Sequence, residues 1–139
     1  MFNCGIDLVK IKRFDNIKNN DSFMKKTFCT NELKYIKKTN YSSNTIAGIY
    51  ACKEAFLKAL KKGINNHNLL NIEVCHDKNN APFIVLHNEL QNKYNNISVS
   101  ISHDGEYAIS IVIILWCFFY IYFISFMPIF IFQIVSVIF

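Results

Sequence analysis

The chain has 139 residues, which suits one domain with its own hydrophobic core and argues against a multidomain protein. Its formal net charge is +5, and every charged residue lies at or before Glu106, so residues 107–139 differ in composition from the rest. A positive charge suits an acidic partner: nucleic acid, an anionic membrane, an acidic protein or a phosphate ligand. The lysines occur as scattered pairs rather than one block, which favours solvated helix faces over a nucleic-acid-binding patch.

The first half of the chain is expected to contain one strand and three helices. Residues 4–11 read as a strand, and residues 23–29 and 31–38 as two short helices, the second with Thr30 as its N-cap candidate. A longer helix is predicted from Ser42 or Ser43 to about residue 62, because apolar residues recur there at steps of three and four. Those residues are Ile46, Ile49, Tyr50, Phe56, Leu57 and Leu60, and Gly63 follows as a C′ residue.

The second half is expected to be mainly extended. Strands are predicted at 70–75, 82–86 and 97–102, with a short helix within 87–94. The stretch 97–102 alternates strictly between apolar residues and serines, so its apolar side chains should face a core. Asp104-Gly105 is predicted as a two-residue hairpin turn, with 107–113 as the returning strand. This order predicts an α+β domain over residues 1–113, with a mostly antiparallel sheet packed on one long central helix, and short helices around it.

The five cysteines have no spacing typical of a disulfide framework or a zinc site. None forms a CxxC pair, the number is odd, and Cys4 and Cys52 lie in apolar patterns, which favours reduced, buried thiols in a reducing compartment. The N-terminus has no signal-peptide or transit-peptide pattern, since Gly5-Ile6-Asp7 follows Met1 closely. We therefore expect a cytoplasmic protein, with a plastid-type organelle as the alternative if an import sequence is missing from this sequence.

Three residues carry the strongest chemical signal. Glu54 and Lys58 stand at i and i+4 in the long predicted helix, so their side chains share one face, and Asp7 lies in the first predicted strand. Two acids that meet on a divalent cation, with a lysine beside them, suit a charged phosphate ester. Taken alone, however, these residues are explained better by a surface Glu–Lys pair and an edge-strand acid, and His103 by a hairpin position.

A series of short motifs lies along residues 3 to about 113. They are Gly5-Ile6-Asp7-Leu8-Val9 with Arg13, Phe23-x-x-Lys26-x-Phe28 with Glu32, Ala47-Gly48, Lys53-Glu54-Ala55-Phe56-x-Lys58-Ala59, Gly63, Asn71-Ile72-Glu73-Val74 with Pro82, and Ser100-Ile101-Ser102-His103 with Glu106-Tyr107-Ala108. Each piece alone is weakly specific. The ordered set resembles the holo-[acyl-carrier-protein] synthase type of 4′-phosphopantetheinyl transferase.

This resemblance implies a reaction. Such enzymes transfer the phosphopantetheine arm of coenzyme A to a serine of apo acyl carrier protein, for fatty acid biosynthesis, and release adenosine 3′,5′-bisphosphate. The resemblance implies Asp7 and Glu54 as Mg²⁺ ligands and Lys58 as the partner of the pyrophosphate. The residue types suit this role, because displacement at phosphorus depends mainly on neutralised oxygens and an oriented nucleophile.

The resemblance also implies binding residues away from the metal. Ser102 and His103 resemble the contact to the 3′-phosphate end of coenzyme A, and Gly63 lies in the turn near the nucleotide. Arg13 and Lys26 match basic positions that face the acidic acyl carrier protein. Small members of this family form trimers with sites between protomers, so we expect a homotrimer in which His103 serves the neighbour's acidic pair.

Two departures from the family pattern bear on coenzyme A. Ile49 stands where arginine is common, and Asp104 where threonine or serine is usual, so a cation is lost and an anion gained near the expected phosphate. Asn80-Ala81-Pro82 also replaces Gly-Lys-Pro, and Cys29 a threonine or serine. The alternative function is therefore a catalytically weakened protein of the same fold that binds coenzyme A or a nucleotide.

Residues 114–139 form an almost wholly apolar C-terminal tail. A membrane helix needs about 20 apolar residues, and this run has room for one. It has no flanking lysine or arginine and contains Pro128 and Gln133, so translated non-coding sequence, a gene-model artefact, is favoured over a membrane anchor. Packing of the tail on the domain is the weakest explanation, because a small fold offers little surface to cover it. A genuine tail would make a third function a small membrane-tethered adaptor whose basic body meets anionic lipid.

Overall fold

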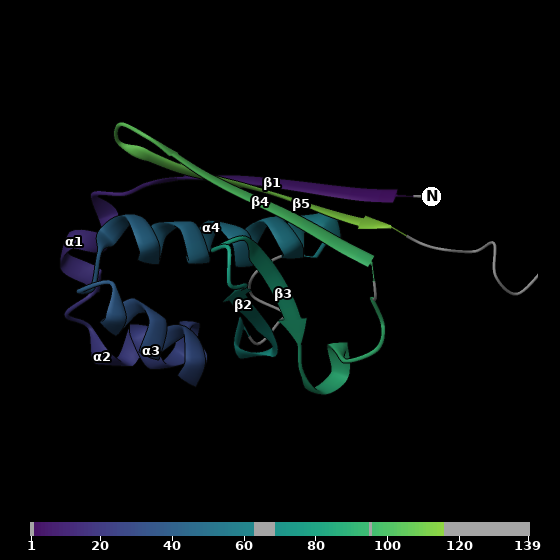
Figure 1. Ribbon diagram of the computed structural model, residues 1–139, viewed down its shortest axis with the longest axis horizontal. Helices are drawn as coiled ribbons and strands as arrows, with labels where there is room; N and C mark the ends of the chain where they lie inside the picture. The colour runs from purple at the N-terminus through teal and green to yellow at the C-terminus, as the bar shows by residue number, and fades with distance from the viewer. Residues whose placement is uncertain (1, 63–68, 95, 116–139) are drawn as a thin grey trace, which may run out of the picture.

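The computed structural model describes residues 2–62, 69–94 and 96–115. The elements in chain order are β1 (Phe2–Lys10), α1 (Arg13–Ile17), α2 (Asp21–Thr27), α3 (Thr30–Lys38), α4 (Ser43–Ala59), the 3₁₀ helix η2 (Leu69–Asn71), β2 (Ile72–His76), β3 (Pro82–Leu86), the 3₁₀ helix η3 (Asn88–Leu90), β4 (Asn96–Asp104) and β5 (Tyr107–Leu115). Helix α4 lies between a layer formed by β1, β5 and β4 and a second layer that contains α2, α3, β2 and β3 (Figure 1).

The strands form two antiparallel sheets, one in the order β1-β5-β4 and the other a β2-β3 hairpin. This confirms the predicted α+β class with antiparallel strands, although the strands are divided between two sheets where we expected one. The division arises because β3 approaches β4 without the backbone pairing that would join them. The second sheet is thereby free to cover the side of α4 that the first sheet leaves open (Figure 1).

Helix α4 packs on the three-stranded sheet through small side chains. Ala47, Ala51, Ala55 and Ala59 recur at every fourth residue and are at most 1% exposed. On the strand side, a Cβ added to Gly5 would lie 2.0 Å from the Ala55 carbonyl oxygen and 2.4 Å from the Ala59 nitrogen. The backbone of β1 therefore touches the last turns of α4 directly, which only glycine allows at that position.

Helix α4 ends earlier than we predicted. Lys61 takes a left-handed φ of 55°, and its amide and that of Lys62 donate to the carbonyl groups of Lys58 (2.9 Å) and Leu57 (3.0 Å). This hydrogen-bond pattern is a Schellman motif, which closes a helix at the left-handed residue. The predicted end near residue 62 is therefore wrong by about one turn, while Gly63 lies outside the described residues. At the other end Ser42, one of the two predicted candidates, is the N-cap residue, but its hydroxyl makes no capping hydrogen bond.

The N-cap residues of α2 and α3 explain where these two helices begin. Helix α2 begins two residues before the predicted start, because the side chain of Asn20 accepts the Phe23 amide at 3.0 Å. The N-cap of α3 is Cys29 rather than Thr30, and its amide donates to the Glu32 carboxylate at 2.6 Å. Helix α1 was not predicted, and only η3 forms within the predicted helix 87–94.

The β4-β5 hairpin turns one residue later than predicted. Asp104 still pairs with Tyr107, so the turn residues are Gly105 and Glu106. Gly105 has a φ of 53° and occupies the first turn position, where a primed hairpin turn requires a positive φ. The strict alternation of β4 is confirmed: Ile97, Val99 and Ile101 pack against the core, whereas the intervening serines are exposed.

Strand β1 has two distinct faces. Gly5, Asp7 and Val9 are buried against α4, whereas Cys4, Ile6 and Leu8 are exposed, so the expectation of a buried Cys4 is wrong. All four described cysteines are free thiols, and burial raises the pKa of Cys52 to about 12, which makes that thiol unreactive near pH 7.

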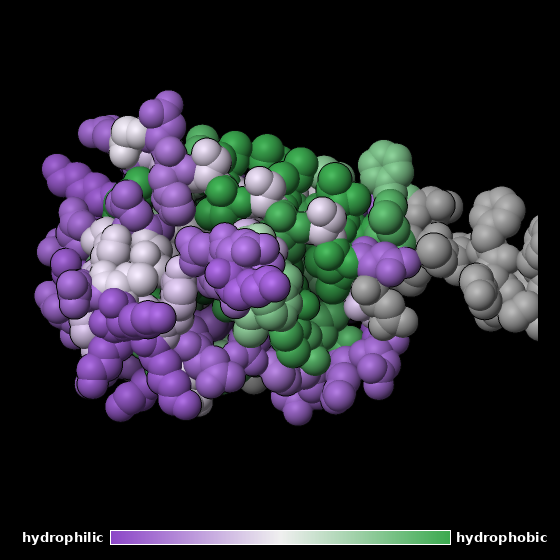
Figure 2. All heavy atoms as spheres, in the orientation of Figure 1, coloured by the Kyte–Doolittle hydropathy of each residue, from purple (hydrophilic) through white to green (hydrophobic). Residues whose placement is uncertain are grey.

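The outward face of the three-stranded sheet carries large exposed hydrophobic side chains, which we call the outer apolar face. They are Phe2, Ile6, Leu8, Tyr107, Ile109 and Leu115, each at least 36% exposed. Hydrophobic atoms gather over this sheet in the space-filling view (Figure 2). An exposed apolar patch of this kind is typical of a surface that meets another protein or a membrane. Within the described ranges, no helix has the length and hydrophobicity of a membrane span.

Candidate active site

Asp7 and Lys58 meet where β1 crosses the last turns of α4. The Lys58 ammonium nitrogen lies 2.6 Å from Asp7 Oδ1, with the lysine side chain 54% exposed and the aspartate side chain 7% exposed. The close packing at Gly5 brings β1 onto the helix, and Asp7, two residues later, points from the same face of the strand. The second oxygen of this carboxylate, Oδ2, is buried without a hydrogen-bond partner.

Glu54 stands one helical turn before Lys58 and is half-buried. Burial raises the pKa of its carboxyl group, and the negative charge of Asp7 raises that pKa further. A hydrogen bond from Tyr50 and the charges of Lys58 and Arg13 act in the opposite direction without cancelling the shift. The two carboxylates are therefore close enough to repel each other, in a site where one permanent cation is already paired.

This acidic pair fits a hard divalent cation. Mg²⁺ takes carboxylate, phosphate and water oxygens as ligands, and it would satisfy the unpartnered Asp7 Oδ2 while relieving the repulsion from Glu54. Among the residues that the structure describes, no group of three His, Cys, Asp or Glu side chains forms a metal site. The described part of the chain thus offers two carboxylates to a cation here, and substrate phosphate and water could supply further ligands.

His103, in β4, packs against the first turns of α4, away from Glu54 and Lys58. Its Nε2 atom is 2.9 Å from the carbonyl oxygen of Asn44, and a Cβ added to Gly48 would lie 2.8 Å from the same ring nitrogen. Gly48 thus makes room for the imidazole against the helix. Ser102 is exposed on the opposite face of β4, so the two residues do not converge within one chain.

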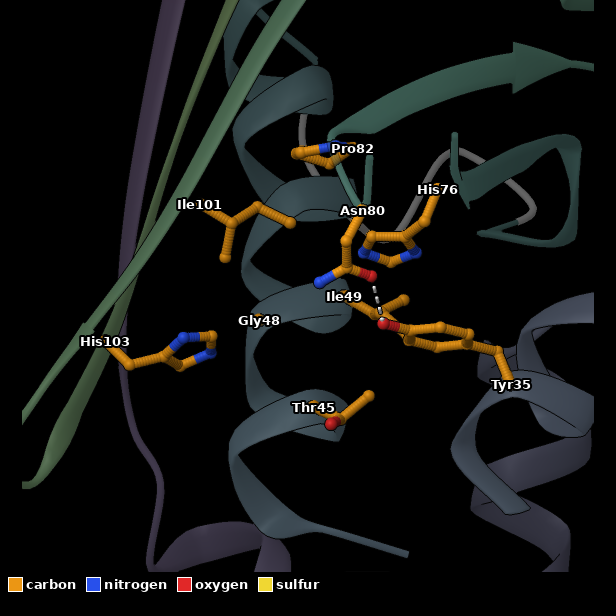
Figure 3. Close-up of a pocket in the computed structure, with 9 residues that line it drawn as sticks. All are labelled: Tyr35, Thr45, Gly48, Ile49, His76, Asn80, Pro82, Ile101 and His103. Carbon is orange, nitrogen blue, oxygen red and sulfur yellow. Dashed lines mark hydrogen bonds between the residues drawn. The ribbon is translucent and has the colours of Figure 1, made fainter. Parts of the chain in front are cut away.

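A groove of about 270 Å³ opens beside His103 between α4, α3 and the two sheets. In Figure 3 the side chains reach it from α3, α4, β4 and the β2-β3 hairpin. It is lined by Tyr35, Thr45, Gly48, Ile49, His76, Asn80, Pro82, Ile101 and His103. The Tyr35 and His76 rings are stacked at 4.3 Å, with 14° between their planes, and the Tyr35 hydroxyl donates to Asn80 Oδ1 at 3.1 Å.

Within one chain, the groove and the acidic pair are separate. Neither Asp7 nor Glu54 is among the described residues that line the groove, and Gly48 and Glu54 are six residues apart in α4, or roughly 9 Å along the helix axis. Arg13 is exposed at the start of α1, near enough for its charge to act on Glu54, and Lys26 is exposed in the last turn of α2. The candidate residue Gly63 lies outside the described residues.

The motif analysis assigned no role to a fully buried ion pair. The Lys53 ammonium lies 2.6 Å from Glu32 Oε2 and also donates to the carbonyl oxygens of Thr27 (2.8 Å) and Leu69 (3.0 Å). The carboxylate of Glu32 accepts the amide of Val74 at 2.8 Å as well. Both side chains are 0% exposed. Through Glu32, Lys53 and the amide of Val74, the pair joins α3, α4 and β2 inside the domain. Both residues belong to the motif pieces above, but the sequence showed one sign of burial, a lysine among small and apolar residues in the middle of a predicted helix.

Comparison with known proteins agrees with this geometry. The model of the 4′-phosphopantetheinyl transferase superfamily matches residues 3–112. The holo-[acyl-carrier-protein] synthase of Finegoldia magna is 41% identical over 112 residues, covering 81% of this chain and 94% of that protein. The synthase of Caldicellulosiruptor saccharolyticus is 42% identical over 118 residues, covering 81% and 95%.

Solved structures give the same result. The Helicobacter pylori holo-[acyl-carrier-protein] synthase in complex with coenzyme A has a TM-score of 0.72 at 33% identity, covering 81% of this chain and 99% of that one. The Bacillus anthracis synthase in complex with CoA (3′,5′-ADP) has a TM-score of 0.68 at 29% identity, covering 81% and 94%. The chain therefore belongs to the holo-[acyl-carrier-protein] synthase family of the 4′-phosphopantetheinyl transferase superfamily, as its motifs indicated.

Proposed function

We propose that this enzyme transfers the 4′-phosphopantetheine arm of coenzyme A to a serine of an apo acyl carrier protein. The reaction is Mg²⁺-dependent, releases adenosine 3′,5′-bisphosphate and serves fatty acid biosynthesis. The observation that carries the proposal is the buried Asp7 carboxylate, with one oxygen unpartnered, beside Lys58 and Glu54. Related synthases with coenzyme A bound support the choice of donor.

The three residues Asp7, Glu54 and Lys58 have distinct roles in this proposal. In this proposal Asp7 and Glu54 hold Mg²⁺, which when bound neutralises charge on the phosphate oxygens. Lys58 is exposed enough to contact the pyrophosphate of the donor and to stabilise charge on the leaving phosphate as a point cation. Glu54, acting through a water molecule, also suits the role of general base toward the serine hydroxyl, because a carboxylate within hydrogen-bond reach of that water can accept a proton from it.

We further propose a homotrimer whose sites lie between protomers. The outer apolar face exposes Phe2 at 66%, Leu8 at 57% and Leu115 at 52%, more than an isolated domain usually leaves in water. The separation of the groove from the acidic pair within one chain points the same way, since a neighbour's groove can complete the site. His103 would then serve the neighbour's Asp7 and Glu54.

The acidic carrier protein is proposed to dock at Arg13 and Lys26. Both side chains are exposed, on α1 and α2, and Arg13 is near enough to Glu54 to affect its ionisation. Basic side chains at the edge of a site mainly raise the rate of encounter with an acidic partner.

The test is a mass measurement on the carrier. The full chain is incubated with Mg²⁺, coenzyme A and an apo acyl carrier protein, and the carrier is expected to gain the mass of one phosphopantetheine. Glu54→Gln should abolish the gain and keep the wild-type circular dichroism spectrum, because the residue lies at the site rather than in the core. Normal turnover in this variant would remove Glu54 from the site.

A second candidate function is a coenzyme A or nucleotide-binding protein without transferase activity. It is favoured by the groove, since no lysine or arginine is among the described residues that line it. The same experiment separates the two functions: coenzyme A binding by calorimetry, without a mass gain under any divalent cation, would establish the binding protein.

We propose a cytoplasmic location and a dispensable tail. Strand β5 continues to Leu115, two residues beyond the predicted domain boundary, so a truncation should end there. Equal carrier modification by the full chain and by residues 1–115 would support this proposal. If the full chain floats with anionic liposomes and residues 1–115 do not, the result would instead support a membrane-associated protein with a genuine tail.

A further inference from the structure

Tyr50 lies one helical turn before Glu54 in α4 and is half-buried beside the candidate active site. Residues four apart in a helix share one face, so the Tyr50 hydroxyl can reach the Glu54 carboxylate. The contact between the two is a hydrogen bond that the hydroxyl donates to the carboxylate. Burial raises the pKa of Tyr50, so the hydroxyl keeps its proton near neutral pH and stays a donor.

Glu54 takes part in none of the ion pairs that join described residues. Lys58, one turn later, is held by Asp7 at 2.6 Å. The charges of Lys58 and Arg13 act on Glu54 without an ion pair, and a hydrogen bond is directional where such a charge is not. The Tyr50 hydroxyl is therefore the group best placed to set the direction in which the Glu54 carboxylate points.

Two aromatic rings from other helices hold the ring of Tyr50. Its centroid lies 5.4 Å from that of Phe14 in α1, which is 0% exposed, and 6.1 Å from that of Phe23 in α2. Ring centroids about 4.5–7 Å apart are typical of aromatic pairs that stabilise a fixed arrangement. Helix α1 is itself tied to the start of α4, because the Ser43 hydroxyl donates to Asp15 at 2.6 Å. The hydroxyl of Tyr50 is thus carried by a ring that is packed on three helices.

We infer that Tyr50 is a positioning residue for the transfer reaction: its hydroxyl, with the ring held by Phe14 and Phe23, orients the Glu54 carboxylate toward the divalent cation. This inference rests on the proposed transferase function, in which Glu54 is a metal ligand. Hydrogen-bond partners of metal-ligating side chains typically contribute about 10–100-fold to metal affinity or activity. Since the phenol is neutral, we expect the lower end of this range, a loss of about tenfold when the hydroxyl is removed.

The alternative is that Tyr50 only fills space in the aromatic cluster. Tyr50→Phe separates the two roles, because phenylalanine keeps the ring and its contacts with Phe14 and Phe23 and removes the hydroxyl alone. A residue that acts by packing would leave metal affinity unchanged in this variant. A residue that orients Glu54 would not.

The first measurement is the Mn²⁺ affinity of the full chain, by electron paramagnetic resonance, without coenzyme A or carrier. Tyr50→Phe should keep the wild-type circular dichroism spectrum and bind Mn²⁺ about tenfold more weakly. Tyr41→Phe is the matched control, since it removes an exposed hydroxyl between α3 and α4, and it should bind Mn²⁺ as the wild type does. Affinities of the wild type and Tyr50→Phe within about twofold of each other would overturn the inference, as would a wild-type chain that binds no Mn²⁺.

A double-mutant cycle with Glu54→Asp shows whether Tyr50 acts through Glu54. Aspartate keeps the negative charge but is one methylene shorter, which moves the carboxylate away from the hydroxyl. Removal of the hydroxyl in this background should change the Mn²⁺ affinity by about twofold or less, so the effects of the two changes should not add. An equal loss of about tenfold in both backgrounds would overturn the inference, because the hydroxyl would then act independently of Glu54.

Carrier modification gives a readout that a change in packing alone would not produce. In Tyr50→Phe, the Mg²⁺ concentration for half-maximal modification should rise about tenfold, while the KM for the carrier stays within about twofold of wild type. A raised KM for the carrier at an unchanged Mg²⁺ requirement would overturn the inference, since Tyr50 would then act in docking. Absence of transfer by the wild type would refute the proposed function, and the Mn²⁺ measurements would still decide the inference.

Discussion

Replacing Lys53 by methionine should destabilise the domain more than any change at its surface. Lys53 is fully buried, and its ammonium holds the Glu32 carboxylate and two backbone carbonyl oxygens. Methionine fills nearly the same volume, so the change mainly removes charge and hydrogen bonds rather than opening a cavity. Breaking a buried ion pair by removing one partner costs about 3–5 kcal/mol, because the other charge stays buried and unpaired.

The loss should depend on pH with a definite sign. Burial raises the pKa of Glu32 in the folded protein even with Lys53 present. A carboxyl group with a raised folded-state pKa supports folding fully below its unfolded pKa, and this support declines as the pH rises through the folded-state pKa. Without Lys53 the folded-state pKa rises further, so the difference from wild type should grow between pH 5 and pH 8. Neutralising the partner in Lys53→Met/Glu32→Gln should recover part of the stability at pH 8.

Urea denaturation followed by far-UV circular dichroism measures the effect, since a shifted midpoint with an unchanged slope reports stability alone. Lys25→Met, on the exposed face of α2, is the control and should change the free energy of unfolding by about 0.5 kcal/mol or less. A loss below about 1 kcal/mol in Lys53→Met, or a loss that is the same at pH 5 and pH 8, would show that removing Lys53 leaves no buried, unpaired charge on Glu32.

Three further predictions concern β1. Gly5→Ala should cost about 1–3 kcal/mol and reduce carrier modification, because its Cβ would meet α4 backbone at 2.0 Å, whereas Cys4→Ala on the exposed face should leave the thermal midpoint within a degree or two. Asp7→Asn should weaken Mn²⁺ binding, measured by electron paramagnetic resonance, by at least about tenfold, and unchanged binding would exclude this carboxylate as a ligand. Leu8→Lys on the outer apolar face should yield a folded monomer by analytical ultracentrifugation, and an assembly of unchanged mass would mean that this face is not the interface.

Local sequence patterns predicted the elements whose residues alternate or repeat regularly. The alternation of β4 and the start of α4 at Ser42 follow from such patterns and are confirmed. The end of α4 was mispredicted because the residue with the left-handed conformation is Lys61. Lysine has no preference for this conformation, so the sequence did not predict it. The predicted hairpin turn was one residue too early, because the prediction placed Asp104 and Gly105 at the two turn positions. In the structure Gly105 occupies the first turn position.

The candidate site was predictable only through the order of its motifs. Asp7 and Lys58 are 51 residues apart, and their contact depends on the approach at Gly5, which no periodicity reveals. The structure places the pair together, while the roles of its members stay predictions. The buried position of Lys53 was hidden for a different reason: a lysine is ordinarily exposed, and its partner Glu32 lies on another helix.

Strand β1 pairs with β5 in one register, from Phe2 opposite Leu115 to Lys10 opposite Tyr107. Because neighbouring side chains of a strand point to opposite sides, a slip of one residue would turn Asp7 outward and bury Ile6 and Leu8 against α4. Inserting or deleting a single residue early in this strand would therefore separate Asp7 from Lys58 and remove Ile6 and Leu8 from the outer apolar face in one step. If Asp7 holds the cation and the outer apolar face meets a neighbouring protomer, as proposed above, both roles depend on one alignment of two strands.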